Sequence, residues 1–161
     1  MNTLKDYRKL YGLFHTANLL KANSILDFGG SLARSTIFSR RYWTSWLEHM
    51  DIPPKTRLDS FDLFGACQFP VYGQVYDNIY QELDDVLANY YGIAALIDVI
   101  PYIEADVLLE LLSLLREHCS CLLLQFSGEP DFPLERLHNL GHCMQATFAA
   151  YDYIVIQTSG L

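Results

Sequence analysis

The 161-residue sequence predicts a three-layer α/β fold, in which helices cover both faces of a seven-strand, mainly parallel sheet. Two observations predict it. Short apolar strand patterns alternate with helical patterns along most of the chain, and the last two strand patterns follow each other directly as a C-terminal antiparallel hairpin. Alternation is typical of a parallel sheet, because a crossover between parallel strands usually contains a helix. The length suits one domain over 1–161, with an N-terminal helix in 1–22 and the α/β core in 23–161.

Five segments have helical patterns. In the first, Leu4, Tyr7, Tyr11 and Phe14 recur at a spacing of three to four residues. The second ends before two prolines, the fourth has a continuous apolar face, and the fifth has Pro133 in its first turn. We expect helices at 5–20, 34–50, 77–89, 104–118 and 133–140.

Seven short segments, rich in apolar residues, have strand patterns. The first runs into two glycines, and the last two are separated by a short link that suits a hairpin. We expect strands at 24–28, 56–64, 71–76, 93–97, 121–126, 144–148 and 153–158.

The charge balance argues against some partners. Lys and Arg total 11 against 19 Asp and Glu, and this net charge of −8 repels nucleic-acid phosphates and anionic lipid. No apolar run approaches the ~20 residues of a membrane helix, and the N-terminus has no apolar signal core. We expect a cytoplasmic protein with reduced thiols, no membrane association and no extended nucleic-acid interface.

In sheets of this kind, ligands bind beyond the carboxyl ends of the strands. A glycine turn or an acidic residue stands at each of those ends: 27–33, Asp62, Asp77, 98–104 and 126–131. The segment 27–33 reads Asp-Phe-Gly-Gly-Ser-Leu-Ala, and its glycines allow backbone to approach a nucleotide closely. The site is therefore predicted at this edge of the sheet.

The spacing within this turn distinguishes two cofactor classes. The dinucleotide template Gly-x-Gly-x-x-Gly would place Arg34 where helix and strand must pack closely, so it matches poorly. The template acid-x-Gly-x-Gly-x-Gly aligns its acid with Asp27 and its three glycines with Gly29, Ser31 and Ala33. All three glycine positions therefore hold small residues. An acid at the strand end suits a cationic ligand and would repel a pyrophosphate.

The turn, together with the later strand ends, resembles class I S-adenosylmethionine-dependent methyltransferases, whose fold is Rossmann-like. The segment Leu-Asp-Phe-Gly-Gly-Ser also resembles the corresponding segment of methyltransferases associated with surface-polysaccharide gene clusters. Ser31 and Ala33 depart from the family's glycines. The resemblance implies S-adenosylmethionine as the cofactor. It also implies cofactor-binding roles for these residues: Asp27, Phe28, Gly29, Gly30 and Ser31 in the turn, Asp62 on the ribose with Asp59 as the alternative, Asp77 or Asn78 on the adenine, and Asp98 after the fourth strand.

The expected reaction is methyl transfer to a small acceptor, because the chain has no obvious inserted substrate domain. Asp98 is a catalytic candidate at the fourth strand end, and Tyr102 and Glu104 could steer or deprotonate an acceptor at the predicted pocket mouth. Two alternatives stay open: a catalytically silent, methyltransferase-like assembly module and a nucleotide-binding oxidoreductase. A homodimer that completes the pocket is a further hypothesis. No metal is predicted, because the His and Cys pairs at 118–121 and 142–143 fit no familiar ligand spacing.

Overall fold

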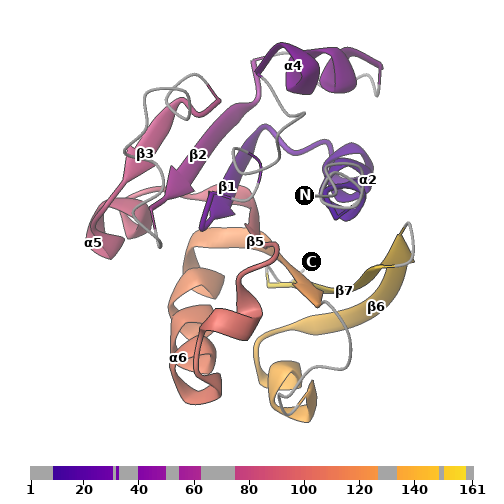
Figure 1. Ribbon diagram of the computed structural model, residues 1–161. Helices are drawn as coiled ribbons and strands as arrows, with labels where there is room; N and C mark the ends of the chain where they lie inside the picture. Colours follow the sequence, from indigo (N-terminus) through magenta and orange to yellow (C-terminus); the bar gives the residue numbers. More distant parts are fainter. Residues whose placement is uncertain are drawn as a thin grey trace.

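The computed structural model describes residues 9–30, 32, 40–49, 55–62, 75–126, 134–148 and 151–158. A twisted sheet forms the middle layer, and the helices lie on its two sides (Figure 1). Strands of this sheet come from both the first and the last parts of the chain, from Ser24 to Gln157. The predicted three-layer α/β architecture is therefore present.

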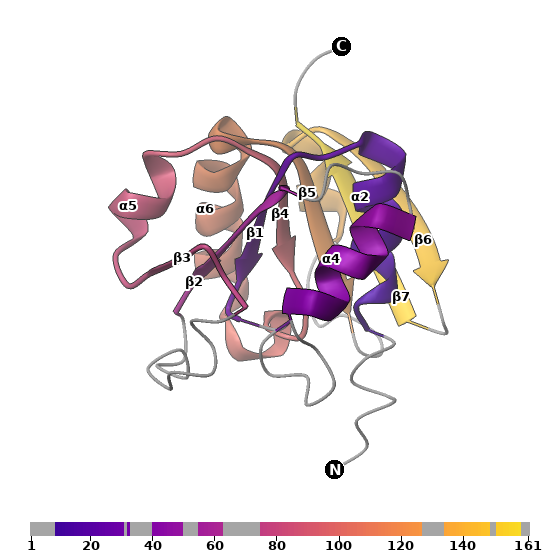
Figure 2. The same cartoon turned by 90° about the horizontal axis from the view of Figure 1, so that it is seen from above.

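The sheet has seven strands in the order β3-β2-β1-β4-β5-β7-β6. The pairings from β3 to β5 are parallel, whereas β7 is antiparallel to both β5 and β6, which confirms the closing hairpin. The arrowheads of β1 and β4 point to the same, lower edge in Figure 2. The strands are β1 Ser24–Phe28, β2 Arg57–Phe61, β3 Asn78–Tyr80, β4 Tyr91–Leu96, β5 Cys119–Phe126, β6 His142–Phe148 and β7 Tyr151–Gln157.

The helices form the two outer layers. On one side lie α2 (Tyr11–Leu20) and α4 (Arg40–His49), and on the other lie α5 (Leu83–Leu87) and α6 (Ala105–Leu115) (Figures 1 and 2). Three short 3₁₀ helices complete the description: η3 Ile100–Tyr102, η4 Arg116–His118 and η5 Leu134–Asn139. No helix among the described residues is long and apolar enough to cross a membrane.

Burial on both faces of the sheet explains why β1, β4 and β5 are largely apolar in sequence. Neighbouring residues of β1 enter different cores: Ile25 joins the cluster that contains Leu13 and Phe14 of α2, and Leu26 joins the one that contains α6. The buried face of α6 is formed by Leu108, Leu109, Leu112 and Leu115. Each helical layer thus removes one apolar face of the sheet from water, which is the main stabilising contribution to such a fold.

The predicted and observed elements agree for β1, β2, β4, β5, α6 and the hairpin, within a few residues at the ends. Two predictions were wrong. The third strand is not at 71–76: Tyr76 lies outside any strand, 71–74 lie outside the described residues, and β3 is Asn78–Tyr80. The helix expected at 77–89 is shorter and is observed as α5. Asp77 does not cap a helix, because its backbone N–H donates to Leu58 O of β2 at 2.7 Å.

Smaller differences concern two other helices. In place of the α-helix expected at 133–140, the described residues form the 3₁₀ helix η5 at Leu134–Asn139, and residue 133 lies outside the described residues. Of the helix expected at 34–50, the described part is α4. The start of the helix expected at 5–20 lies outside the described residues, and α2 accounts for the rest.

Two buried thiols in β5 give a test of this core. Burial raises the pKa of Cys119 and of Cys121 to about 12, so very little reactive thiolate forms below pH 10. We expect iodoacetamide at pH 9 to modify both far more slowly than Cys143, whose side chain is only partly buried, as followed by peptide mass spectrometry. Modification of Cys119 and Cys121 at the rate of Cys143 in folded protein would contradict this packing.

Candidate functional site

The turn after β1 has a backbone that favours glycine. Gly29 and Gly30 have φ angles of 96° and 73°, in the left-handed region where a Cβ atom is costly. The Gly29 N–H donates to Phe61 O at 3.0 Å, and the Gly30 N–H donates to Asp27 O at 3.3 Å. The turn is thereby fixed to the end of β2, and it presents backbone without side chains at the carboxyl edge of the sheet.

The side chain of Asp27 stabilises this turn by accepting a hydrogen bond from a residue beyond the glycines. Its carboxylate is fully buried, and Oδ2 accepts hydrogen bonds from the Leu32 N–H at 2.8 Å and from the Tyr76 hydroxyl at 2.5 Å. The bond to Leu32 spans the turn, because it joins the last part of β1 to a residue beyond the glycines. Ser31 and Ala33, on which part of the predicted motif depends, lie outside the described residues.

Phe28 and Asp62 occupy different positions with respect to the edge. The Phe28 ring is 2% exposed and stacks on Phe61 with centroids 4.9 Å apart, so its side chain belongs to the core and only its backbone faces the turn. Asp62 follows β2 directly, is half-buried, and donates its N–H to Tyr80 O at 2.8 Å. Asp62 is next to Phe61, whose carbonyl accepts the Gly29 N–H. The residue predicted to bind the ribose therefore lies beside the glycine turn.

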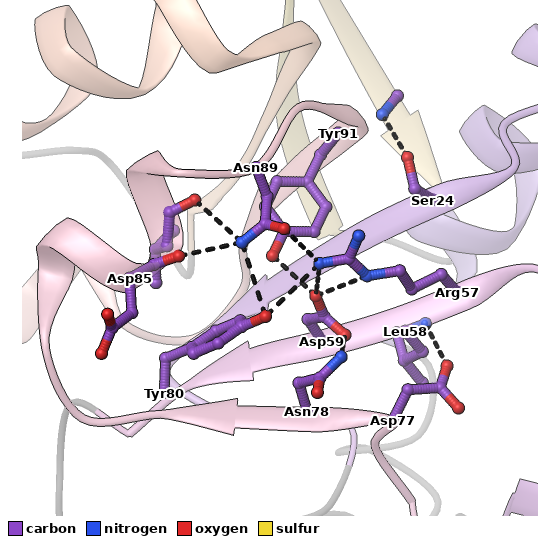
Figure 3. Close-up of polar contacts among 12 residues, drawn as sticks. Ser24, Arg57, Leu58, Asp59, Asp77, Asn78, Tyr80, Asp85, Asn89 and Tyr91 are labelled. Carbon is purple, nitrogen blue, oxygen red and sulfur yellow. Dashed lines mark hydrogen bonds and ion pairs between the residues drawn. The ribbon is translucent and has the colours of Figure 1, made fainter.

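The alternative acid, Asp59, is engaged elsewhere. It is fully buried within β2, and its Oδ2 accepts bonds from Arg57 Nη2 at 2.5 Å and from the Tyr91 hydroxyl at 2.7 Å (Figure 3). Asn78 Nδ2 donates to the other oxygen at 2.9 Å. These bonds engage both carboxylate oxygens of Asp59 within the fold, and the ribose role of Asp62 stays a prediction.

The same network perturbs its other members. The hydrogen bond from Arg57 to Asp59 raises the pKa of the guanidinium above its ordinary value, and burial raises the pKa of the Tyr91 hydroxyl. Both groups therefore remain protonated donors. Arg57 Nη2 also donates to Asn89 Oδ1 at 2.7 Å, and its guanidinium lies 5.4 Å from the centre of the Tyr91 ring. The network joins β2, β3 and the start of β4.

Asp77 and Asn78 do not lie after the third strand, which corrects the sequence prediction. Asp77 precedes β3 and accepts the Leu58 N–H on Oδ2 at 2.8 Å, and Asn78 is the first residue of the strand (Figure 3). The short Asn-Ile-Tyr strand lies downstream of the apolar stretch that was expected to form it. Gln81 and Glu82 follow β3 instead.

Asp98 follows β4 with a left-handed backbone, at φ 59°. Its N–H donates to Oε1 of the buried Gln125 at 2.9 Å, and its Oδ1 pairs with Lys9 Nζ at 3.0 Å. A non-glycine residue in this region is strained by about 1–3 kcal/mol, which is a feature that clusters at functional sites. The structure therefore places Asp98 at the predicted edge, in a defined turn.

Lys9 was not identified from the sequence. Its side chain is 13% exposed, its amine lies 6.0 Å from the centre of the Tyr151 ring, and its carbonyl accepts the Tyr153 hydroxyl. Its partner Asp98 is distant in the sequence, so no local spacing could have indicated the pair. The fold brings Lys9, just before α2, to the carboxyl end of β4 and so adds a cation beside Asp98.

Tyr102 and Glu104 also lie beyond β4. Tyr102 ends η3 with its side chain 70% exposed, and the exposed Glu104 precedes α6. Their exposure makes them accessible to an acceptor, and their proposed chemical roles stay predictions. Among the described residues, no group of three His, Cys, Asp or Glu side chains could hold a metal ion.

The edge as a whole has the geometry of a nucleotide-type site. The strand order reverses between β1 and β4, where the glycine turn lies, and Asp62 and Asp98 follow the strands on either side of β1. Open α/β sheets bind ligands at this switch point. The glycines of the turn let a ligand approach backbone closely, while the two carboxylates can accept hydrogen bonds from hydroxyl or ammonium groups.

Solved structures share this fold. An O-methyltransferase family protein from Burkholderia thailandensis superimposes with a TM-score of 0.62 at 10% identity, over 94% of this chain and 56% of that one. Human N-acetylserotonin methyltransferase in complex with S-adenosylmethionine gives 0.61 at 13% identity, over 93% and 51%. The bifunctional kinase-methyltransferase WbdD gives 0.54 at 12% identity, over 98% and 38%.

These likenesses show that the chain has the class I methyltransferase fold. The chain spans only about half the length of the first two structures. No protein-family model and no curated protein sequence matches the chain.

Proposed function

We propose that this chain binds S-adenosylmethionine at the carboxyl edge of β1, β2 and β4 and transfers its methyl group to a small acceptor. The observation that carries the proposal is the left-handed Gly29-Gly30 turn at the switch point, with Asp62 and Asp98 on its two sides. The fold shared with methyltransferases supports it. The same edge suits a pyrophosphate poorly, because carboxylates flank the turn and repel negative charge.

The residues present fit this cofactor in three respects. The two glycines leave room for close approach of a ligand to backbone. Asp62 would accept hydrogen bonds from ribose hydroxyls, and Asp27 would act through the turn, since its oxygen already bonds Leu32 and Tyr76. When bound, the cofactor supplies a methyl group activated by a sulfonium centre.

The contribution of the chain to the reaction would be mainly positioning. Methyl transfer depends on in-line placement of the acceptor atom and the methyl group, and well-oriented placement contributes several kcal/mol to rate acceleration. Asp98, held by Lys9 and Gln125, would fix one side of the acceptor pocket. Tyr102 or Glu104 would orient the acceptor or accept its proton.

The Asp62→Ala variant tests the cofactor site. Because a hydrogen bond to a charged group contributes roughly 1.5–3 kcal/mol, we expect its affinity for S-adenosylhomocysteine to fall at least about tenfold in calorimetric titration. Glu117→Ala is the matched control, since it removes an exposed carboxylate just before β5, at the opposite edge, and should bind like the parent chain.

Two results would overturn the proposal. One is the absence of binding by parent protein that unfolds cooperatively, which would favour the silent assembly module. The other is tighter binding of a nicotinamide dinucleotide than of S-adenosylhomocysteine, which would favour the oxidoreductase.

A further inference from the structure

A cavity lies away from the carboxyl edge, toward the opposite ends of the sheet's strands. It has a volume of about 700 Å³ and opens between α2 and the strands β4 to β7. Gly92 and Ser120, which line it, are the second residues of β4 and β5, so the cavity lies toward the amino ends of the parallel strands. This placement separates it from Gly29, Asp62 and Asp98. Its volume is within the usual range for sites that bind small molecules.

The walls of this groove are apolar and open to solvent. Leu19 and Leu20 of α2 are 75% and 43% exposed, and Met144 of β6 is 53% exposed. Ala146 and Val155 continue the apolar wall on the hairpin. These side chains come from α2 and from the hairpin of β6 and β7, which are far apart in sequence, and they converge on one cavity. Apolar side chains gathered in this way commonly mark a binding site.

The charge of the groove differs from that of the chain. Among the described residues that line it none is acidic, although the chain carries 19 acidic residues against 11 Lys and Arg. These lining residues include Lys21, His15 and His142. Lys21 is the C-cap of α2 with φ 49°, and its Nζ donates to Asn18 Oδ1 at 3.3 Å, which holds the amine at the groove. An anionic group would meet cationic and donor groups here, and no carboxylate from the described lining.

We propose that this groove binds an elongated apolar molecule with one anionic head, of the chemical class of medium-chain carboxylates. The apolar tail lies along Leu19, Met144 and Val155, and the head lies near Lys21. The backbone carbonyls at the end of α2 do not oppose the head strongly, because Ala17 O and Asn18 O already accept the N–H groups of Ala22 and Lys21. The proposal is independent of the methyltransferase proposal.

The probe is sodium dodecanoate, titrated below its micellar concentration into the full chain and followed by calorimetry. We expect saturable one-to-one binding. Met144→Glu places a carboxylate in the groove and should weaken binding at least about tenfold. Val107→Glu is the matched control, because Val107 is also 53% exposed but lies on α6 across the sheet, and its affinity should stay unchanged.

A charge reversal tests the head group. Lys21→Glu should weaken dodecanoate about tenfold and change the binding of dodecanol, which has the same tail without the charge, less than about twofold. Arg136→Glu reverses a charge on η5, where Arg136 forms an exposed pair with Asp106, and should leave both affinities unchanged.

Three outcomes would overturn the inference: no saturable binding, equal affinity in Met144→Glu and the parent, or a dimer in light scattering that Met144→Glu dissociates, which would make the groove an interface between two copies. Titration with S-adenosylhomocysteine separates the two proposals. Met144→Glu should retain the parent affinity for it, so loss of dodecanoate binding alone concerns only the groove.

Discussion

The Arg57→Met variant is expected to lose about 3–5 kcal/mol of unfolding free energy, because it leaves the fully buried Asp59 carboxylate without its cation. Tyr91 and Asn78 would still donate to Asp59, but neither carries a charge to balance it. Urea denaturation followed by circular dichroism measures the difference. A loss this large would identify the network as a major constraint on the β2 and β4 region.

Two comparisons make this result specific. Arg136→Met removes an exposed ion pair with Asp106 and should cost at most about 1 kcal/mol. The double variant Arg57→Met/Asp59→Leu should recover part of the loss, since it removes the uncompensated charge but leaves the Tyr91 hydroxyl and the Asn78 amide without their acceptor. A loss below about 1 kcal/mol in Arg57→Met, or no recovery in the double variant, would contradict a stabilising ion pair between Arg57 and the buried Asp59.

The second large effect is expected at Gly12 in α2. A Cβ atom there would overlap three carbon atoms of the Tyr153 ring, which is itself 1% exposed and has little room to move. Replacing glycine by alanine inside a helix ordinarily stabilises it by roughly 1 kcal/mol. Here we expect Gly12→Ala to destabilise the fold by about 1–3 kcal/mol, the usual cost of overpacking a core.

A second background tests whether the Tyr153 ring causes the expected loss of unfolding free energy in Gly12→Ala. In a Tyr153→Leu background the ring is absent, so Gly12→Ala should become neutral or stabilising in the same urea assay. Because the Tyr153 hydroxyl also donates to the Lys9 carbonyl, displacement of α2 in Gly12→Ala should disturb the pair between Lys9 and Asp98. A stabilised Gly12→Ala protein would show that α2 does not pack this closely on β7.

The parts of the fold that could be predicted are those with strong local patterns. β1, β4 and β5 are buried on both faces, so their apolar runs stand out, and α6 carries a clear apolar face. β3 was misplaced because three residues of mixed polarity, with one end exposed, carry almost no signal of their own. Pairing with β2 stabilises that strand, and such pairing is not visible in the local sequence.

Some residues of the candidate site could also be predicted from local sequence patterns, and others could not. The glycines after β1 and the acids after β2 and β4 could be found, because each follows a recognisable strand at the edge where ligands bind. The sequence could not distinguish Asp59 from Asp62, since both acids belong to the same short segment and only the structure shows that Asp59 is bonded to Arg57 and Tyr91. Lys9 was missed because its partner is remote in sequence.

The most direct test of the central claim is to map S-adenosylhomocysteine on the chain by amide NMR. We expect the amide signals of Gly29, Gly30, Asp62 and Asp98 to shift on saturation, whereas those of Ser120 and His142, at the opposite edge, stay in place. Shifts confined to the opposite edge, or no shifts at saturating ligand in folded protein, would contradict the claim that the carboxyl edge is the cofactor site.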